Sequence, residues 1–168
     1  MTITVTSKTL NDYDAHLAVN TATAYLRQSD LAYYLIDQLE KQKLKLTLEV
    51  SSDPAYANKD TSRDGTLVWS LLSDTLISAE ASDVSTLLSR TPQTQKPYIA
   101  SHLNLLHLLA LACQQLNDQL NFRDADATWP WLDEKTLSAT DIDNVVAREL
   151  SDKAFPDGQN WDRLLTRN

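Results

Sequence analysis

The stretch from Tyr98 to Leu120 is apolar around most of its circumference when it is drawn as a helix. Its longest apolar run, from Leu103 to Cys113, is interrupted by Asn104 and His107 and is shorter than the ~20 residues of a membrane span. A helix that is hydrophobic on nearly every side lies in a protein interior. We therefore expect a central buried helix in a soluble protein that is not embedded in a membrane.

Four further segments are expected to be helical because of their apolar spacing or their caps. They are residues 12–27, residues 31–39 with Ser29 or Asp30 as the cap, residues 83–90, and a segment that begins at Ser138. In this last segment, Asp141 completes a capping-box-like pair with Ser138. The helix is expected to end before Pro156 and Gly158, and a docking tail follows with Trp161, Leu164 and Leu165.

Two segments are expected to be strands, and the first of them alternates strictly between apolar and polar residues, which is the period of a half-buried strand. They are residues 44–50 (LKLTLEV) and 66–70 (TLVWS), and the polar loop 51–65 between them ends in an Asp64–Gly65 turn. We expect the two strands to pair in a small antiparallel sheet packed on the central helix. The sequence thus predicts a helix-rich α+β fold with a single domain over residues 1–168.

Scarce residue types exclude several classes of protein. Two glycines are too few for a phosphate-binding loop, and three histidines with one cysteine do not supply a zinc ribbon or finger. Cys113 is alone, so no intrachain disulfide can form, which fits a reducing compartment. We expect no metal and no cofactor.

The net charge of −8 disfavours nucleic acid as a partner, because the phosphate backbone repels an acidic protein. Residues Met1 to Leu10 lack the basic region and the apolar core of a secretory signal. We therefore expect a cytoplasmic protein, or one delivered by a secretion system that needs no signal peptide. A protein partner fits these features, and the sequence leaves the oligomeric state open.

Three polar residues form a candidate catalytic site. Asn104 and His107 share one face of the central helix, and Glu149 lies in line with apolar residues of the last helix. A carboxylate on a core-facing stripe needs a partner, which His107 or Arg148 can supply. The alternative for all three residues is a structural role, in which each side chain pairs with another residue of the fold or lies at the solvent-facing edge of its helix. His102 and His107 diverge by roughly 140° on the helix and do not face one metal ion.

The acidic loop 121–135 contains a candidate protein-binding segment. Two indoles stiffened by a proline lie beside two carboxylates, and aromatic anchors often dominate interface energetics. The binding candidates are Trp129, Trp131, Asp133 and Glu134. The alternative is that both rings cap the hydrophobic core. Calcium binding in an EF-hand geometry is excluded, because Trp129 and Lys135 occupy the positions of the required glycine and glutamate.

The order of these features resembles the zincin-like metallopeptidase domains of bacterial type III effectors and polymorphic toxins. The resemblance covers residues 16 to 155 and rests on two N-terminal helices followed by the strings LKLTLEV, DGTLVWS, PYIASHLNLLHLLALA and VVAREL. Domains of this family carry an HExxH zinc motif on the central helix.

Residues 103–107 occupy the span of that motif. The resemblance implies that His107 is the second histidine ligand, that Leu103 replaces the first, and that Asn104 replaces the general-base glutamate. Glu149 matches the downstream acidic position. Leucine cannot bind zinc and neutral asparagine cannot take a proton from water, so the resemblance implies a scaffold without peptidase chemistry.

Our leading functional expectation is a catalytically degenerate zincin-like effector or toxin-type domain that acts through protein binding. One alternative is an acidic immunity or adaptor protein that neutralises a basic partner. Another is a hydrolase of unknown class that uses Asn104, His107 and Glu149.

Overall fold

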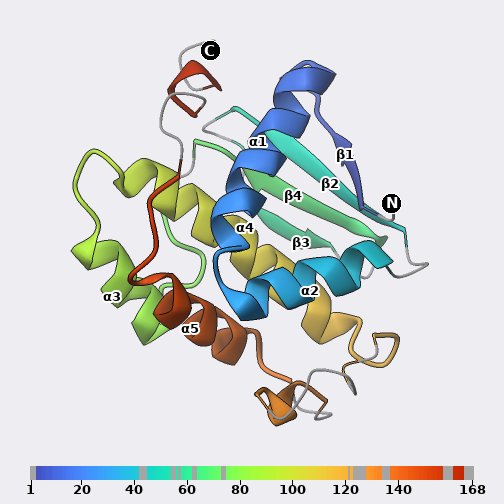
Figure 1. The fold of residues 1–168 in the computed structure, drawn as a ribbon. Coiled ribbons are helices and arrows are strands. Elements are labelled where there is room, and N and C mark those ends of the chain that lie inside the picture. The colour runs from blue at the N-terminus through green and yellow to red at the C-terminus, as the bar shows by residue number, and fades with distance from the viewer. Residues whose placement is uncertain are drawn as a thin grey trace.

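The structure is a computed structural model that describes residues 3–41, 45–53, 56, 58–61, 64–72, 75–120, 122, 128–133, 137–156 and 161–164. The elements follow in the order β1 (Ile3–Thr6), α1 (Asp12–Leu26), α2 (Asp30–Lys41), β2 (Leu46–Ser51), β3 (Lys59–Thr61), β4 (Thr66–Ser70), α3 (Ser82–Arg90), α4 (Lys96–Gln115), η2 (Pro130–Asp133, a 3-10 helix) and α5 (Ala139–Leu150). Figure 1 shows the helices on one side of a four-stranded sheet. The predicted helix-rich α+β class is confirmed.

The strand order in the sheet is β1-β2-β4-β3. β1 and β2 are parallel, β2 and β4 are parallel, and β3 and β4 are antiparallel. The prediction of an antiparallel pair between segments 44–50 and 66–70 is therefore wrong. The cause is β3, which lies within the predicted polar loop and adds a second reversal of the chain, so that β4 runs in the same direction as β2. The second reversal contains Gly65, whose φ of 79° is a conformation that glycine adopts at little cost.

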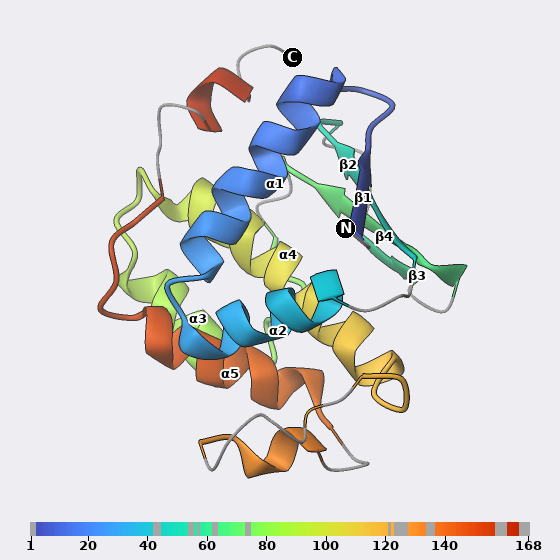
Figure 2. The same ribbon diagram turned by 45° about the vertical axis from the view of Figure 1, so that its right-hand side comes forward.

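β1 was not anticipated, although its residues alternate in the manner of a strand. Ile3 and Val5 are buried, whereas Thr4 and Thr6 are exposed. α1 and α2 connect β1 to β2, and α1 and α4 contact the strands on the buried face of the sheet (Figure 2). Neighbouring parallel strands need such a crossover, because a hairpin can join only antiparallel strands.

α4 is the central helix of the fold. It contacts α1, α2, α3, α5, β3 and β4, and nearly all its side chains from Ile99 to Cys113 are buried. The predicted central buried helix is confirmed, with bounds shifted towards the N-terminus. Pro97 lies in its first turn, where the missing N–H costs no helical hydrogen bond. Among the helices of the described residues, none has the length and apolar character needed to cross a membrane.

Other predicted features are found at the ends of elements. Ser138 caps α5 by accepting a hydrogen bond from the Asp141 backbone N–H at 3.5 Å. Trp161 and Leu164 are fully buried, which confirms the docking of these two tail residues. Several residues of the sequence analysis lie outside the described residues, namely Glu134, Lys135, Gly158 and Leu165.

Candidate functional site

Asn104 is completely buried and faces the segment that follows β4. Its Oδ1 accepts a hydrogen bond from the backbone N–H of Ile77 at 2.9 Å, and its Nδ2 donates to the carbonyl of Thr75 at 2.9 Å. Buried polar groups require partners, and here both ends of the carboxamide have one. The side chain thereby fastens segment 75–77 to α4.

His107, nearly one helical turn after Asn104, contacts α5. Its Nδ1 lies 2.6 Å from Oδ2 of Asp143, and the two side chains are 15% and 1% exposed. Burial raises the pKa of the Asp143 carboxyl, and the hydrogen bond with His107 offsets part of that rise. When Asp143 is ionised, it can only accept, so Nδ1 carries the proton and Nε2 of a neutral ring is the acceptor. This is the orientation in which a histidine can serve as a general base.

Asp143 was missed by the sequence analysis, although the pattern of α5 contains a signal for it. The buried residues of this helix recur at three- and four-residue spacing, and they are Ala139, Ile142, Asp143, Val146, Ala147 and Leu150. Asp143 therefore stands within the core-facing stripe. A carboxylate there needs a partner on a neighbouring helix, and His107 is that partner.

The side chain of Glu149, a residue of α5, lies beside the N-terminus of α2. Its Oε1 accepts hydrogen bonds from the Ser29 hydroxyl at 2.7 Å and from the Leu31 backbone N–H at 3.1 Å. Ser29 in turn accepts from the Ala32 N–H at 3.1 Å. A carboxylate is favoured at a helix N-terminus, because the free N–H groups and the helix dipole are positive there.

The expected pairing of Glu149 with His107 or Arg148 is therefore wrong. His107 bonds to Asp143 on another face of α5, and the Nε of Arg148 lies 3.3 Å from Oδ2 of Asp83. Among the described residues, Asn104, His107 and Glu149 each bond to a different segment and not to one another. Their joint catalytic role stays a prediction.

Trp129 and Trp131 are both partly buried against the core, while Asp133 is exposed. The ring of Trp129 lies 5.9 Å from the ring of Tyr34 on α2. Trp129 thus covers the end of the helical layer, which fits the alternative reading of a ring that caps the core.

Trp131 also packs against the core, and in addition it lines a cleft of about 400 Å³ between η2, α3 and α5, which we term the Trp131 cleft. The other lining residues are Asp83, Asp141, Asn144, Val145 and Arg148. Asn144 accepts from the backbone N–H of Asp83 at 3.0 Å and so ties α3 to α5. An indole beside the carboxylates of Asp83 and Asp141 is chemically suited to a cationic side chain.

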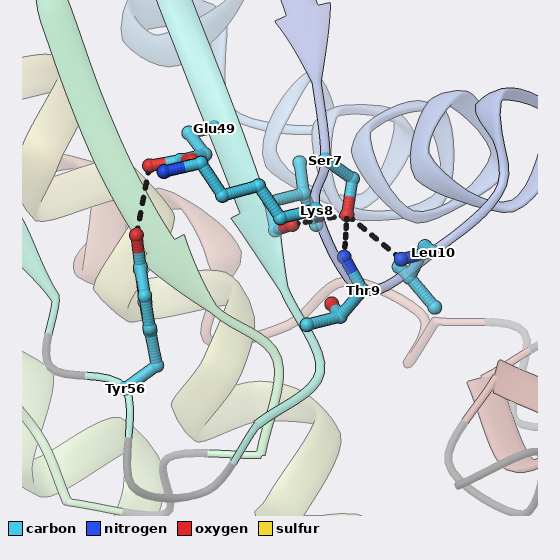
Figure 3. A network of polar contacts seen from close by, with 7 residues as sticks. Ser7, Lys8, Thr9, Leu10, Glu49 and Tyr56 are labelled. Atoms are coloured by element: carbon cyan, nitrogen blue, oxygen red, sulfur yellow. Dashed lines mark hydrogen bonds and ion pairs between the residues drawn. The ribbon is translucent and has the colours of Figure 1, made fainter.

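The sequence analysis also missed a polar network at the carboxyl ends of β1 and β2 (Figure 3). The Ser7 hydroxyl donates to a β2 carbonyl at 2.5 Å and accepts from the Leu10 N–H at 2.9 Å. Glu49 binds Lys8 at 3.4 Å and accepts from the Tyr56 hydroxyl at 2.9 Å, which raises the pKa of Tyr56. Ligands often bind at this edge of open parallel sheets. Here the polar groups pair with one another and fasten the connection between β1 and α1 to β2.

His102 is completely buried among aromatic rings. Its ring lies 4.7 Å from Trp161, edge to face, and 5.7 Å from Tyr25. Neither ring nitrogen has a hydrogen-bond partner within the part of the chain that is described. Burial lowers the pKa of the imidazole to about 3, so His102 is neutral and packs as an aromatic core residue.

Leu103, at the position of the first zinc ligand in the resembled motif, is completely buried. Within the described ranges, no three His, Cys, Asp or Glu side chains come together in a group that could hold a metal ion. Comparison of the chain with protein-family models, curated proteins and solved structures gives no match.

Proposed function

We propose that the chain is a zincin-like domain without peptidase chemistry that acts by binding another protein. The observation that carries this proposal is the bonding of Asn104. Asn104 occupies the position of the general base in the resembled motif. Both its side-chain donor and its side-chain acceptor form hydrogen bonds with the backbone of segment 75–77. A side chain held in this way supports the fold rather than a reaction.

The Trp131 cleft supplies the binding surface in this proposal. Its indole is a rigid aromatic anchor, and such anchors are enriched at interface hot spots. Asp83 and Asp141 contribute two carboxylates to the cleft, and Arg148, which pairs with Asp83, contributes one positive charge, so the lining is net negative by one charge. The net charge of −8 of the whole chain also favours a basic partner. In the alternative of an acidic immunity or adaptor protein, the same contact would neutralise the basic partner.

Affinity capture tests this proposal. Wild-type protein and Trp131→Ala are immobilised and exposed to the same cell extract, and captured proteins are compared by mass spectrometry. Tyr13→Ala is the matched control, because Tyr13 is a 69% exposed aromatic on α1. We expect a defined set of basic proteins to be lost with Trp131→Ala and kept with Tyr13→Ala. Equal capture by all three proteins would contradict the proposal.

A hydrolase is the second candidate, and the His107–Asp143 pair favours it. A carboxylate at Nδ1 orients the imidazole as in a histidine that acts as a general base through Nε2. A panel of chromogenic esters and peptides tests this function. Turnover that is lost in both His107→Gln and Asp143→Asn, with folding retained, would establish it over the binding proposal.

A further inference from the structure

β1 forms one edge of the sheet, and in the described part of the chain no strand pairs with its outer side. Figures 1 and 2 show β1 next to β2, with no drawn helix or strand beyond it. An edge strand presents unpaired backbone N–H and C=O groups. β1 therefore offers a row of backbone donors and acceptors to another strand.

The two edges of the sheet differ in how well they are protected. β3, at the opposite edge, is three residues long and carries Lys59 and Asp60. Both edge strands are short, but charged side chains on an edge strand discourage pairing with another chain. β1 carries no charge and no proline, and its residues are all β-branched, with high strand propensity. Of the two edges, β1 is the one suited to accept a strand.

A narrow cleft of about 80 Å³ lies beside β1, between this strand and helices α1 and α2, and we term it the β1–α1 cleft. Ile3 and Val5 line it from β1, and Val19 and Thr23 line it from α1. Alternate side chains of a strand added to β1 point to the same face as Ile3 and Val5. One of these side chains is then directed towards the cleft.

We propose that β1 accepts an extended peptide segment of a partner protein as a fifth strand, with one aliphatic side chain of that segment in the β1–α1 cleft. Backbone hydrogen bonds to β1 supply affinity, and the cleft supplies specificity. The net charge of −8 favours a segment with basic flanks. This inference rests on the proposed protein-binding function, but it uses a surface separate from the Trp131 cleft.

A second copy of the chain fits this surface less well than a peptide does. Ile3 and Val5 are only 9% and 8% exposed, so two copies paired through β1 would present inward side chains already packed in their own cores. The β1–α1 cleft would then stay empty. A four-residue strand spans only ~13 Å, so pairing of two copies through β1 alone would bury far less than the ~800 Å² that each partner buries in a stable interface.

The test uses a synthetic capped peptide in which valine and threonine alternate between lysine flanks. Binding is followed by NMR on isotope-labelled full-length protein. We expect amide shifts in β1 and at Val19, and slower hydrogen exchange at alternate amides of β1. N-methylation of the valines removes backbone donors of the peptide, so the methylated peptide should not bind.

Two matched variants test the cleft. Thr23→Phe places a ring in the β1–α1 cleft, whereas Thr21→Phe makes the same change on another face of α1. Both threonines donate to the carbonyl four residues earlier, at 2.8 and 2.7 Å, so the two variants lose a similar helical contact, and Thr23→Phe loses in addition a 3.4 Å contact with the Asn20 carbonyl. We expect Thr23→Phe to weaken peptide binding about tenfold or more and Thr21→Phe to change it by less than about twofold.

Several outcomes would overturn the proposal: no shifts in β1 at millimolar peptide, equal binding of the methylated peptide, or equal affinity of both variants. Dimers seen in sedimentation without peptide, together with slow hydrogen exchange of the β1 amides in that dimer, would also overturn it, because a second copy would then occupy the edge. Shifts confined to the Trp131 cleft would refute strand addition while leaving the proposed function intact. If the peptide adds to β1 but Trp131→Ala captures the same proteins as the wild type, strand addition would stand and binding at the Trp131 cleft would be refuted.

Discussion

Asn104 bonds through both ends of its carboxamide to backbone atoms of Thr75 and Ile77 while it is completely buried. We predict that Asn104→Ala lowers the free energy of unfolding by about 1–3 kcal/mol, because it leaves a backbone donor and acceptor unpaired. Urea denaturation measures the change. Asn20→Ala, at an exposed position of α1, is the control and should cost less than about 0.5 kcal/mol. Equal stability of both variants would show that the two bonds contribute nothing.

His102 gives the fold a pH dependence whose sign can be worked out. Its pKa in the folded protein is lowered to about 3, whereas an unfolded histidine titrates near 6.5. Between these values the unfolded chain binds a proton that the folded chain does not, so stability falls as pH falls from about 6.5 towards 3. Above about 6.5 the residue contributes no pH dependence.

The variant His102→Phe isolates this contribution. The ring of phenylalanine fills similar space, and both nitrogens of His102 lack partners in the described structure, so the fold should tolerate the change. We predict that the wild type loses about 1–2 kcal/mol more stability than His102→Phe between pH 6.5 and pH 5. Chemical denaturation at both pH values measures this. Parallel curves for the two proteins would contradict the assignment of a neutral buried imidazole.

At the scale of elements, α5 caps α2 through Glu149. We predict that Glu149→Ala lowers the free energy of unfolding by about 1 kcal/mol, because the Ser29 hydroxyl and the Leu31 N–H lose their acceptor. Thermal denaturation measures the loss. Glu80→Ala removes the same charge at an exposed position outside the helices and should leave the melting temperature nearly unchanged. An equal effect of both changes would indicate a general charge effect instead of a cap.

The elements themselves were partly predictable. α4 and α5 were expected because their apolar spacing and the Ser138 cap are local signals that tertiary structure did not override. The direction of β4 was not predicted correctly, because it depends on β3. This short polar strand cannot be distinguished from a loop by its local sequence. Ile3–Thr6 alternates between apolar and polar residues as a strand does. Four residues are too few, however, to distinguish a strand from an irregular N-terminal segment by sequence.

At the scale of the whole molecule, the candidate site could be anticipated only in part. Asn104 and His107 stood out as polar residues on an apolar helix, yet the sequence does not show which distant segment each one meets. His107 meets Asp143 36 residues away, and Glu149 meets Ser29 120 residues away. Such pairings follow from how α2, α4 and α5 pack, which is a property of the complete fold.

The central claim is that the polar residues of α4 hold the fold together while binding occurs at the Trp131 cleft. Capture of a partner by His107→Ala and by Trp131→Ala, both kept below their melting temperatures, tests this claim most directly. Our interpretation predicts that His107→Ala melts at a lower temperature but retains the partner, whereas Trp131→Ala melts near the wild type and loses it. Loss of the partner with His107→Ala and its retention with Trp131→Ala would contradict the claim.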